Sequence, residues 1–269
     1  MRRKLVIEFT KMHGAANDFI VIDNRFLRLP DDLLVRIVQS YADRRTGIGA
    51  DGLIALSAAR NDEAAVRMLY LNADGSEGTM CGNGLRCLAH AAYVGGVDMR
   101  SFTVETGAGN LPVALHKISE DGDDALVAAT MDASGGVRRL DDGSYYVWTG
   151  TDHRVVLVDD VDQIDVDGMG PSLRAPSVEL PHGANVNWIS AHGDGYRIRT
   201  FERGVEGETM ACGTGATAAA RVLDDLDKNR WASIRLYANG GPLTIDLNTP
   251  IRLIGPSKRV YRGTIEIVP

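Results

Sequence analysis

Short apolar segments, several of which alternate apolar with polar residues, recur along the whole chain. In the first half they span residues 19–22, 52–56, 66–71, 102–104 and 112–118. In the second half they span residues 125–131, 145–148, 155–158, 186–190, 196–201, 234–237, 243–247 and 260–268. A period of two is typical of strands with one buried face, so the pattern predicts a protein built mainly of sheet.

Helical patterns are limited to three segments. The first spans residues 32–44, with Pro30 ahead of it, acidic residues in its first turn and basic residues in its last, as the helix dipole favours. The other two follow Cys81 and Cys212 and are rich in alanine. A helix of such small residues can be packed closely on all sides, as it would be inside a curved sheet.

The two alanine-rich segments are introduced by the same short sequence. Residues 80–84 read Met-Cys-Gly-Asn-Gly and residues 211–215 read Ala-Cys-Gly-Thr-Gly, each after an acidic, glycine-containing approach. The predicted fold class is therefore α/β (α+β), with two pseudo-symmetric domains. Each would be a curved, mostly antiparallel sheet or barrel around a central helix. The polar segment 119–124 is the best candidate for the boundary, and we expect a cleft between tightly packed halves.

Each copy places a cysteine at the start of a helix. The first backbone N–H groups of a helix are unpaired and carry a partial positive charge, so they bind a carboxylate well. The same field favours the thiolate form of a nearby cysteine. A single Cys-Gly-x-Gly could be an ordinary helix-capping turn, but its duplication indicates chemistry. A thiolate is a general base and a thiol a general acid, so Cys81 and Cys212 could invert a carbon between them.

Composition narrows the class of protein. The chain has 269 residues, a hydrophobic content of 44% and a formal net charge of -7, without a Lys/Arg run. Nucleic-acid and anionic-membrane partners are therefore not expected. No segment resembles a transmembrane span or a signal peptide. The three cysteines suit neither a disulfide framework nor a zinc site, and Cys87 reads as a buried hydrophobe. We expect a cytoplasmic protein without a metal.

Further motifs lie around the two cysteine sequences. Residues 11–19 read Lys-Met-His-Gly-Ala-Ala-Asn-Asp-Phe, residues 49–52 Gly-Ala-Asp-Gly, and residues 72–77 Asn-Ala-Asp-Gly-Ser-Glu. Residues 202–209, Glu-Arg-Gly-Val-Glu-Gly-Glu-Thr, precede the second cysteine sequence. In this order, over nearly the whole chain, they resemble the diaminopimelate epimerases. These are cofactor-independent isomerases that interconvert LL- and meso-2,6-diaminopimelate for lysine and peptidoglycan biosynthesis.

The resemblance implies roles for individual residues. Cys81 and Cys212 would be the acid/base thiols, with further catalytic roles for His153 and Glu202. A guanidinium suits the carboxylate of the second amino-acid head of diaminopimelate, and a carboxylate such as Glu202 suits an ammonium. The residues implied in substrate binding are Asn17, Asn72, Gly82, Asn83, Asn185, Glu202, Arg203, Gly213 and Thr214.

The resemblance also bears on cofactors, assembly and domain boundaries. It implies no cofactor, and no lysine has the supporting phosphate loop that pyridoxal phosphate would need. It implies a homodimer that acts on a small amino-acid substrate. The last strand would cross back to the first half, so that residues 1–122 and 262–269 form one domain and residues 123–261 the other.

The chain departs from the family pattern beside His153. The family usually has Gly-Asn-Pro-His, whereas residues 150–153 read Gly-Thr-Asp-His. Thr151 thus stands where an asparagine would help to bind the distal head, and Asp152 adds a negative charge. Two alternatives stay open: a racemase of another amino acid, such as histidine or proline, on the same two-cysteine scaffold, and a non-catalytic relative. In the latter, replacing either thiol would change nothing.

Overall fold

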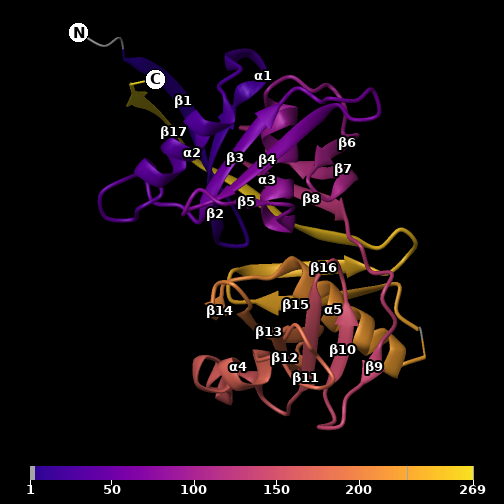
Figure 1. Ribbon diagram of the computed structural model, residues 1–269. Coiled ribbons are helices and arrows are strands. Elements are labelled where there is room, and N and C mark those ends of the chain that lie inside the picture. Colours follow the sequence, from indigo (N-terminus) through magenta and orange to yellow (C-terminus); the bar gives the residue numbers. More distant parts are fainter. Residues whose placement is uncertain (1–3, 229, 269) are drawn as a thin grey trace. The chain divides into compact units, whose positions relative to one another are not determined.

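The computed structural model describes residues 4–228 and 230–268 (Figure 1). The chain divides into two compact units: unit 1 runs up to Ala129 and resumes at Pro256, and unit 2 is Thr130–Gly255. The expected boundaries lay at residues 122/123 and 261/262. They differ because residues 119–124 form a turn inside unit 1, where the Ser119 N–H donates to the Asp124 carbonyl at 2.8 Å.

The strands of unit 1 close into a barrel. Each is hydrogen-bonded to the next, and β17 pairs with both β8 and β1. The β2–β3 and β4–β6 pairs are parallel, and the β1–β2, β3–β4, β6–β7 and β7–β8 pairs are antiparallel. In ring order the strands are β1 (Leu5–Gly14), β2 (Asn17–Asp23), β3 (Gly52–Ser57), β4 (Val66–Asn72), β6 (Ser101–Thr106), β7 (Gly109–Ile118), β8 (Asp124–Thr130) and β17 (Arg252–Ile267).

Helix α3 (Gly82–Val94) fills the barrel, and α2 (Asp31–Tyr41) covers its outside. Alternate residues of β2 serve the two cores: Phe19 and Val21 pack with α3, and Ile20 and Ile22 pack with α2. Both faces of this strand are therefore buried, which explains its uninterrupted apolar sequence. The short elements α1 (Asn24–Leu27) and β5 (Glu77–Gly78) complete unit 1.

Unit 2 repeats this plan around α5 (Gly213–Leu226), which contacts β10, β11, β12 and β16. The order antiparallel, parallel, antiparallel, parallel recurs in the pairs β10–β11, β11–β12, β12–β13 and β13–β15. The elements are β9 (Arg138–Arg139), β10 (Tyr145–Trp148), β11 (Asp152–Leu157), η1 (Val161–Gln163), α4 (Val166–Arg174), β12 (Asn185–His192), β13 (Gly195–Glu202), β14 (Gly207–Thr209), β15 (Ser233–Ala238) and β16 (Gly241–Asp246).

The fold class predicted from the sequence is confirmed. Each unit is a curved, largely antiparallel sheet around one alanine-rich helix (Figure 1). One local prediction differs from the structure, and some elements were not predicted. The first long helix ends at Tyr41, so Arg44 is not in its last turn and instead pairs with Asp18 and Asp51. The strand β1 and the helices α1 and α4 were not predicted. No helix in the described residues is long and apolar enough to cross a membrane.

Candidate functional site

The central helices α3 and α5 begin in the same way. Cys81 is the N-cap residue of α3, with φ -137° and ψ 117°, and Cys212 is that of α5, with φ -113° and ψ 112°. Asn83 and Thr214, which are common N-cap residue types, lie inside the first turn instead. Each helix begins at the glycine that follows an extended cysteine. The first N–H groups of a helix have no intrahelical partner, and here they belong to this glycine-led first turn. These groups are what a carboxylate would bind.

In unit 1, the cysteine belongs to a hydrogen-bonded cluster around Asn17. The Cys81 thiol donates to Asn17 Oδ1 at 3.5 Å, and Asn83 Nδ2 donates to the same oxygen at 3.2 Å. Asn17 Nδ2 in turn donates to Asp51 Oδ2 at 2.7 Å. The structure thus brings together three residues that the sequence placed in the site: Cys81, Asn17 and Asn83.

A tight hairpin positions Asn17. Ala15 and Ala16, between β1 and β2, both have positive φ, at 53° and 62°. A two-residue turn of this kind matches the twist of the strands that it joins, although it is costly for residues other than Gly, Asn and Asp. His13 Nδ1 accepts from the Ala16 N–H at 3.3 Å and supports the turn.

Two carboxylates and two cations anchor the other side of Asn17. Lys11 Nζ lies 2.7 Å from Asp18 Oδ2, and Arg44 contacts Asp18 at 2.8 Å and Asp51 at 2.6 Å. Burial raises the pKa of Asp18, but hydrogen bonds from Arg44 and Lys11 outweigh it and hold that pKa at about 2. Both acids of the anchor are thus tied to a cation, which fixes Asp51 as the acceptor for Asn17.

Arg86 supports the start of α3 from within the barrel. It is fully buried, and Nη2 donates to Asn83 Oδ1 at 2.9 Å, Nη1 to the Gly82 carbonyl at 3.3 Å and Nε to the Pro256 carbonyl at 3.3 Å. Burial lowers the pKa of this guanidinium. Sequence reasoning assigned Arg86 no role, because nothing in its local pattern tells a buried arginine from a solvated one.

In unit 2, Gly215 lets α5 approach a buried asparagine. A Cβ on Gly215 would lie 2.1 Å from Asn187 Oδ1 and 3.3 Å from Cys212 Cβ. Cys212 itself lies 3.4 Å, Sγ to Oγ1, from Thr214, and the Thr149 hydroxyl donates to the Thr214 carbonyl at 3.0 Å. The last glycine of the second cysteine sequence is therefore required by its close packing against Asn187, next to the cysteine.

Asn187 links this helix start to His153. Its Nδ2 donates to His153 Nδ1 at 3.1 Å and to the Arg154 carbonyl at 3.0 Å, while its Oδ1 accepts from the Thr200 hydroxyl at 3.0 Å. Asn187 was not predicted. The available signal was the Asn-Val-Asn sequence at 185–187, which puts two amides on one face of an otherwise apolar strand.

His153 is neutral and has an unused donor. Because Nδ1 accepts from Asn187, the proton of the neutral ring is on Nε2. The Nε2 atom is buried without a hydrogen-bond partner among the described residues. Burial, followed by the charge of Arg203, lowers the pKa of His153 to about 3. The ring therefore offers a hydrogen bond at neutral pH and does not carry a charge.

A second group of predicted residues surrounds Arg203. Asn185, which lies opposite His153 in the β11–β12 ladder, accepts from the Arg203 N–H at 2.8 Å through Oδ1. The guanidinium contacts Thr151 Oγ1 at 3.0 Å and Asp152 Oδ2 at 3.4 Å. Glu202, the last residue of β13, precedes Arg203 and is half-buried. The two positions that depart from the family pattern thus contact the predicted substrate-binding arginine directly.

Asn72 is the predicted residue of unit 1 with the least connection to the thiol. It ends β4, where its Oδ1 accepts from the Tyr70 hydroxyl at 2.7 Å and its Nδ2 donates to Ser76 Oγ at 3.0 Å. These contacts hold the turn that precedes the first cysteine sequence.

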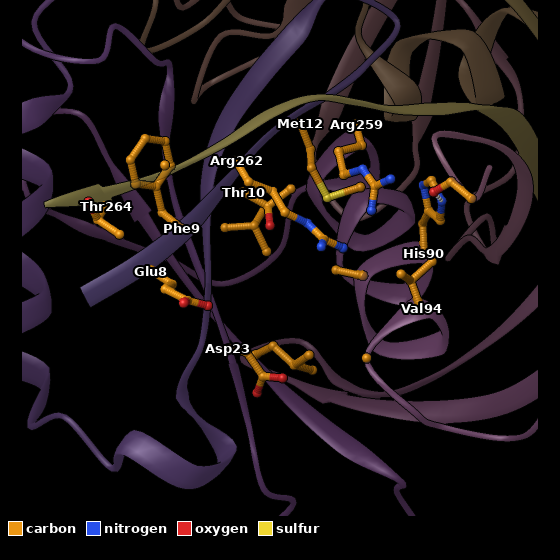
Figure 2. A pocket seen from close by; sticks show the side chains of 16 residues that line it. Glu8, Phe9, Thr10, Met12, Asp23, His90, Val94, Arg259, Arg262 and Thr264 are labelled. Atoms are coloured by element: carbon orange, nitrogen blue, oxygen red, sulfur yellow. Dashed lines mark hydrogen bonds between the residues drawn. The ribbon is translucent and has the colours of Figure 1, made fainter. Parts of the chain in front are cut away.

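A cavity of about 480 Å³ lies elsewhere in unit 1, at the far end of α3. Figure 2 shows Glu8, Asp23, Arg259 and Arg262 around it, and Val94 marks the end of the helix. A helix of 13 residues is roughly 20 Å long, so Val94 is far from Cys81. None of the predicted site residues is among the described residues that line this cavity, and it is not part of the candidate site.

Solved structures share the fold at low sequence identity. A PhzF-family phenazine biosynthesis protein from Bacillus anthracis matches with a TM-score of 0.72 and 17% identity, over 98% of this chain and all of its own. A hydroxyproline epimerase from Agrobacterium vitis, with bound trans-4-hydroxy-L-proline, matches with a TM-score of 0.67 and 18% identity, over all of this chain and 95% of its own.

Sequence relatives are closer and agree on one family. A diaminopimelate epimerase from Methanocella arvoryzae is 37% identical over 278 residues, covering 97% of both chains. One from Chlorobaculum tepidum is 38% identical over 261 residues, covering 95% of this chain and all of its own. The family model described as diaminopimelate epimerase matches residues 9–133 and 145–263. The chain therefore belongs to the diaminopimelate epimerase family, a family of isomerases.

Proposed function

We propose that this protein is a cofactor-independent diaminopimelate epimerase that interconverts LL- and meso-2,6-diaminopimelate by inverting one α-carbon. The observation that carries the proposal is the cysteine at the start of the central helix in each unit, followed by a glycine-led first turn. Membership of the family supports the reaction, and the repetition of this helix start supports a chemistry that uses two thiols.

In the proposed mechanism, one cysteine is a thiolate and the other a thiol. The thiolate removes the α-proton, and the thiol gives its proton to the opposite face of the same carbon. The first cysteine ends protonated and the second deprotonated, which is the state needed for the reverse reaction. Backbone N–H groups at Gly82–Asn83 and Gly213–Thr214 bind the adjacent carboxylate and stabilise the negative charge that develops when the proton leaves.

Other residues of the site bind and orient the substrate in this proposal. His153 donates one hydrogen bond through Nε2 as a neutral ring, in keeping with its depressed pKa of about 3. Glu202 binds an ammonium group, and Arg203 with Asn185 binds the carboxylate of the amino-acid head that does not react. Asn17 and Asn72 bind the substrate from unit 1.

The cellular setting belongs to the same proposal. We place the enzyme in lysine and peptidoglycan biosynthesis, as a cytoplasmic homodimer that requires no cofactor. Light scattering coupled to size-exclusion chromatography measures the mass in solution, and a mass near 29 kDa, that of one chain, would reject the homodimer.

The function is tested by offering the reduced protein LL- and meso-diaminopimelate and a panel of single-headed amino acids, including histidine and proline. Chiral chromatography follows inversion. We expect inversion of diaminopimelate alone. Inversion of a single-headed amino acid instead would show a racemase on the same scaffold. No inversion of any member of the panel would favour a non-catalytic relative.

A further inference from the structure

Arg203 is held from several sides within unit 2. Its Nη1 donates to the carbonyls of His182 at 2.9 Å and Gly183 at 3.2 Å, and its Nη2 donates to Thr151 Oγ1 at 3.0 Å. Its backbone N–H is held by Asn185. The Nε atom has no partner among the described residues, so one N–H edge of the guanidinium remains for a carboxylate.

Asp152 is the one carboxylate that contacts this guanidinium among the described residues, with Oδ2 3.4 Å from Nη1. A side chain this close can fix the orientation of the guanidinium only if it is itself fixed. Tyr146 supplies that constraint, because its hydroxyl donates to the other oxygen, Oδ1, at 2.9 Å.

Tyr146 is well placed to act as a fixed donor. It lies on β10, next to β11, where Asp152 is paired with Trp148. The Arg138 guanidinium lies 5.1 Å above the centre of its ring. Burial and the hydrogen bond to Asp152 both raise the pKa of Tyr146, so the hydroxyl keeps its proton at neutral pH.

We propose that Tyr146 and Asp152 are a positioning pair that orients the Arg203 guanidinium toward the carboxylate of the non-reacting head of the substrate. This inference rests on the proposed function and goes beyond it, because the family pattern has a proline where Asp152 stands. Thr151 takes part as well: its oxygen accepts from Arg203, so its own proton can be donated to the same carboxylate. The departure at residues 151–152 thus preserves the distal-head site with different side chains.

The pair is tested with the variants Y146F, D152A, D152N and the double variant Y146F/D152A. The matched control is Y145F, the same change at the neighbouring position of β10, whose side chain points to the other face of the sheet. Steady-state rates with LL-diaminopimelate give KM and kcat separately, and isothermal titration calorimetry with meso-diaminopimelate gives Kd.

We expect D152A to raise KM and Kd about tenfold and Y146F about threefold, with kcat within about twofold of wild type, as for a loss of substrate binding alone. D152N keeps an oxygen facing Tyr146 and should have a smaller effect than D152A. Because Tyr146 acts through Asp152, the double variant should match D152A alone. Y145F should leave both constants unchanged.

Three results would refute the proposed role of Tyr146 and Asp152. These are an unchanged KM and Kd in D152A, an effect of Y145F as large as that of Y146F, or a double variant whose effect is the product of the two single effects. A wild-type protein that binds diaminopimelate but does not invert it would reject the proposed function, and the Kd values of the variants would still decide the inference. A wild-type protein that neither binds nor inverts diaminopimelate would reject both.

Discussion

Replacing Gly215 by alanine is the substitution for which the structure makes the sharpest claim about the second helix start. The added Cβ would lie 2.1 Å from Asn187 Oδ1, where ordinary contact begins near 3.4 Å, so Asn187 would have to move by more than 1 Å. Asn187 is fully buried and makes three hydrogen bonds of 3.0–3.1 Å, to His153, Arg154 and Thr200. A shift of this size breaks or distorts all three.

The expected cost follows from these contacts. A buried polar group left without its partner costs about 1–3 kcal/mol, and partial relaxation keeps the total below the sum of three such losses. Alanine gains about 1 kcal/mol over glycine in a helix interior. We therefore expect G215A to lower the free energy of unfolding of unit 2 by about 2–4 kcal/mol.

The assay uses urea denaturation followed by tryptophan fluorescence. Trp148, Trp188 and Trp231 all lie in unit 2, and Trp188 is fully buried, so the signal reports on this unit. The matched control is G84A, the equivalent position in unit 1, followed by circular dichroism. There the new Cβ would meet Ile54 Cδ1 at 2.9 Å, the end of a flexible side chain, and Cys81 Cβ at 3.5 Å. We expect G84A to change stability by less than about 1 kcal/mol.

Two outcomes would refute this reasoning. One is a G215A protein within about 0.5 kcal/mol of wild type, which would mean that Asn187 is not locked by its hydrogen bonds. The other is a larger loss of stability in G84A than in G215A. The packing predicts the reverse, because the new Cβ meets a flexible side chain at Gly84 and a hydrogen-bonded, buried one at Gly215.

Three further predictions concern residues around the two helix starts. The pKa of His153 is lower when folded, at about 3, than its ordinary 6.5, so the unfolded chain takes up the proton first. The free energy of unfolding therefore falls as pH falls from 6.5 toward 3, by about 1.4 kcal/mol per pH unit. Denaturant titrations over this pH range should show this slope in wild type relative to H153Q. The same pH dependence of stability in both proteins would contradict the prediction. K11M leaves the half-buried Asp18 with Arg44 as its remaining cation and should cost about 2 kcal/mol at pH 7 in the same titrations, whereas an unchanged stability would mean that Arg44 suffices. A16G relieves a positive φ of 62° and should raise the free energy of unfolding by about 0.5–1 kcal/mol, which a higher thermal midpoint would show. A lower thermal midpoint would mean that the turn is not strained.

The parts of the fold that follow from local pattern were predictable from the sequence. Strands such as β6, β15 and β16 bury alternate residues, and this period of two is visible in the chain. Strand β1 was missed because its alternation fails at two positions: Val6 is exposed, and Lys11 occupies a buried position. The structure buries Lys11 against Asp18, a residue of the next strand, and no local rule anticipates that pairing.

Helix α4 was missed for a related reason. Its sequence contains two glycines and Pro171, which argue against a helix. The helix is held by the Asp165 side chain, which accepts from the Gly168 N–H, and by packing of Val166 with Trp188 and Phe201. Tertiary contacts outweigh local propensity here.

The candidate site shows the same division. The two cysteines were found because their sequence is repeated, and their asparagine, glycine and arginine partners were assigned by resemblance. Asn187 and Arg86 were not found, because each acts through a contact with a residue distant in the chain. Tyr146 was not found either, because its contact with Asp152 depends on how the neighbouring strands pair. A hydrogen bond between strands leaves no periodic trace in a single sequence.

The central claim is that two thiols act on opposite faces of one carbon, and isotope incorporation tests it most directly. The reduced enzyme is given LL-diaminopimelate in deuterated water, and early in the reaction NMR measures α-deuterium separately in the substrate and in the meso product. A separate acid and base predict deuterium in the product and almost none in the remaining substrate, with inversion lowered at least about a thousandfold in both C81A and C212A. Deuterium that appears first in unreacted LL-diaminopimelate, or inversion that survives either substitution, would contradict the account.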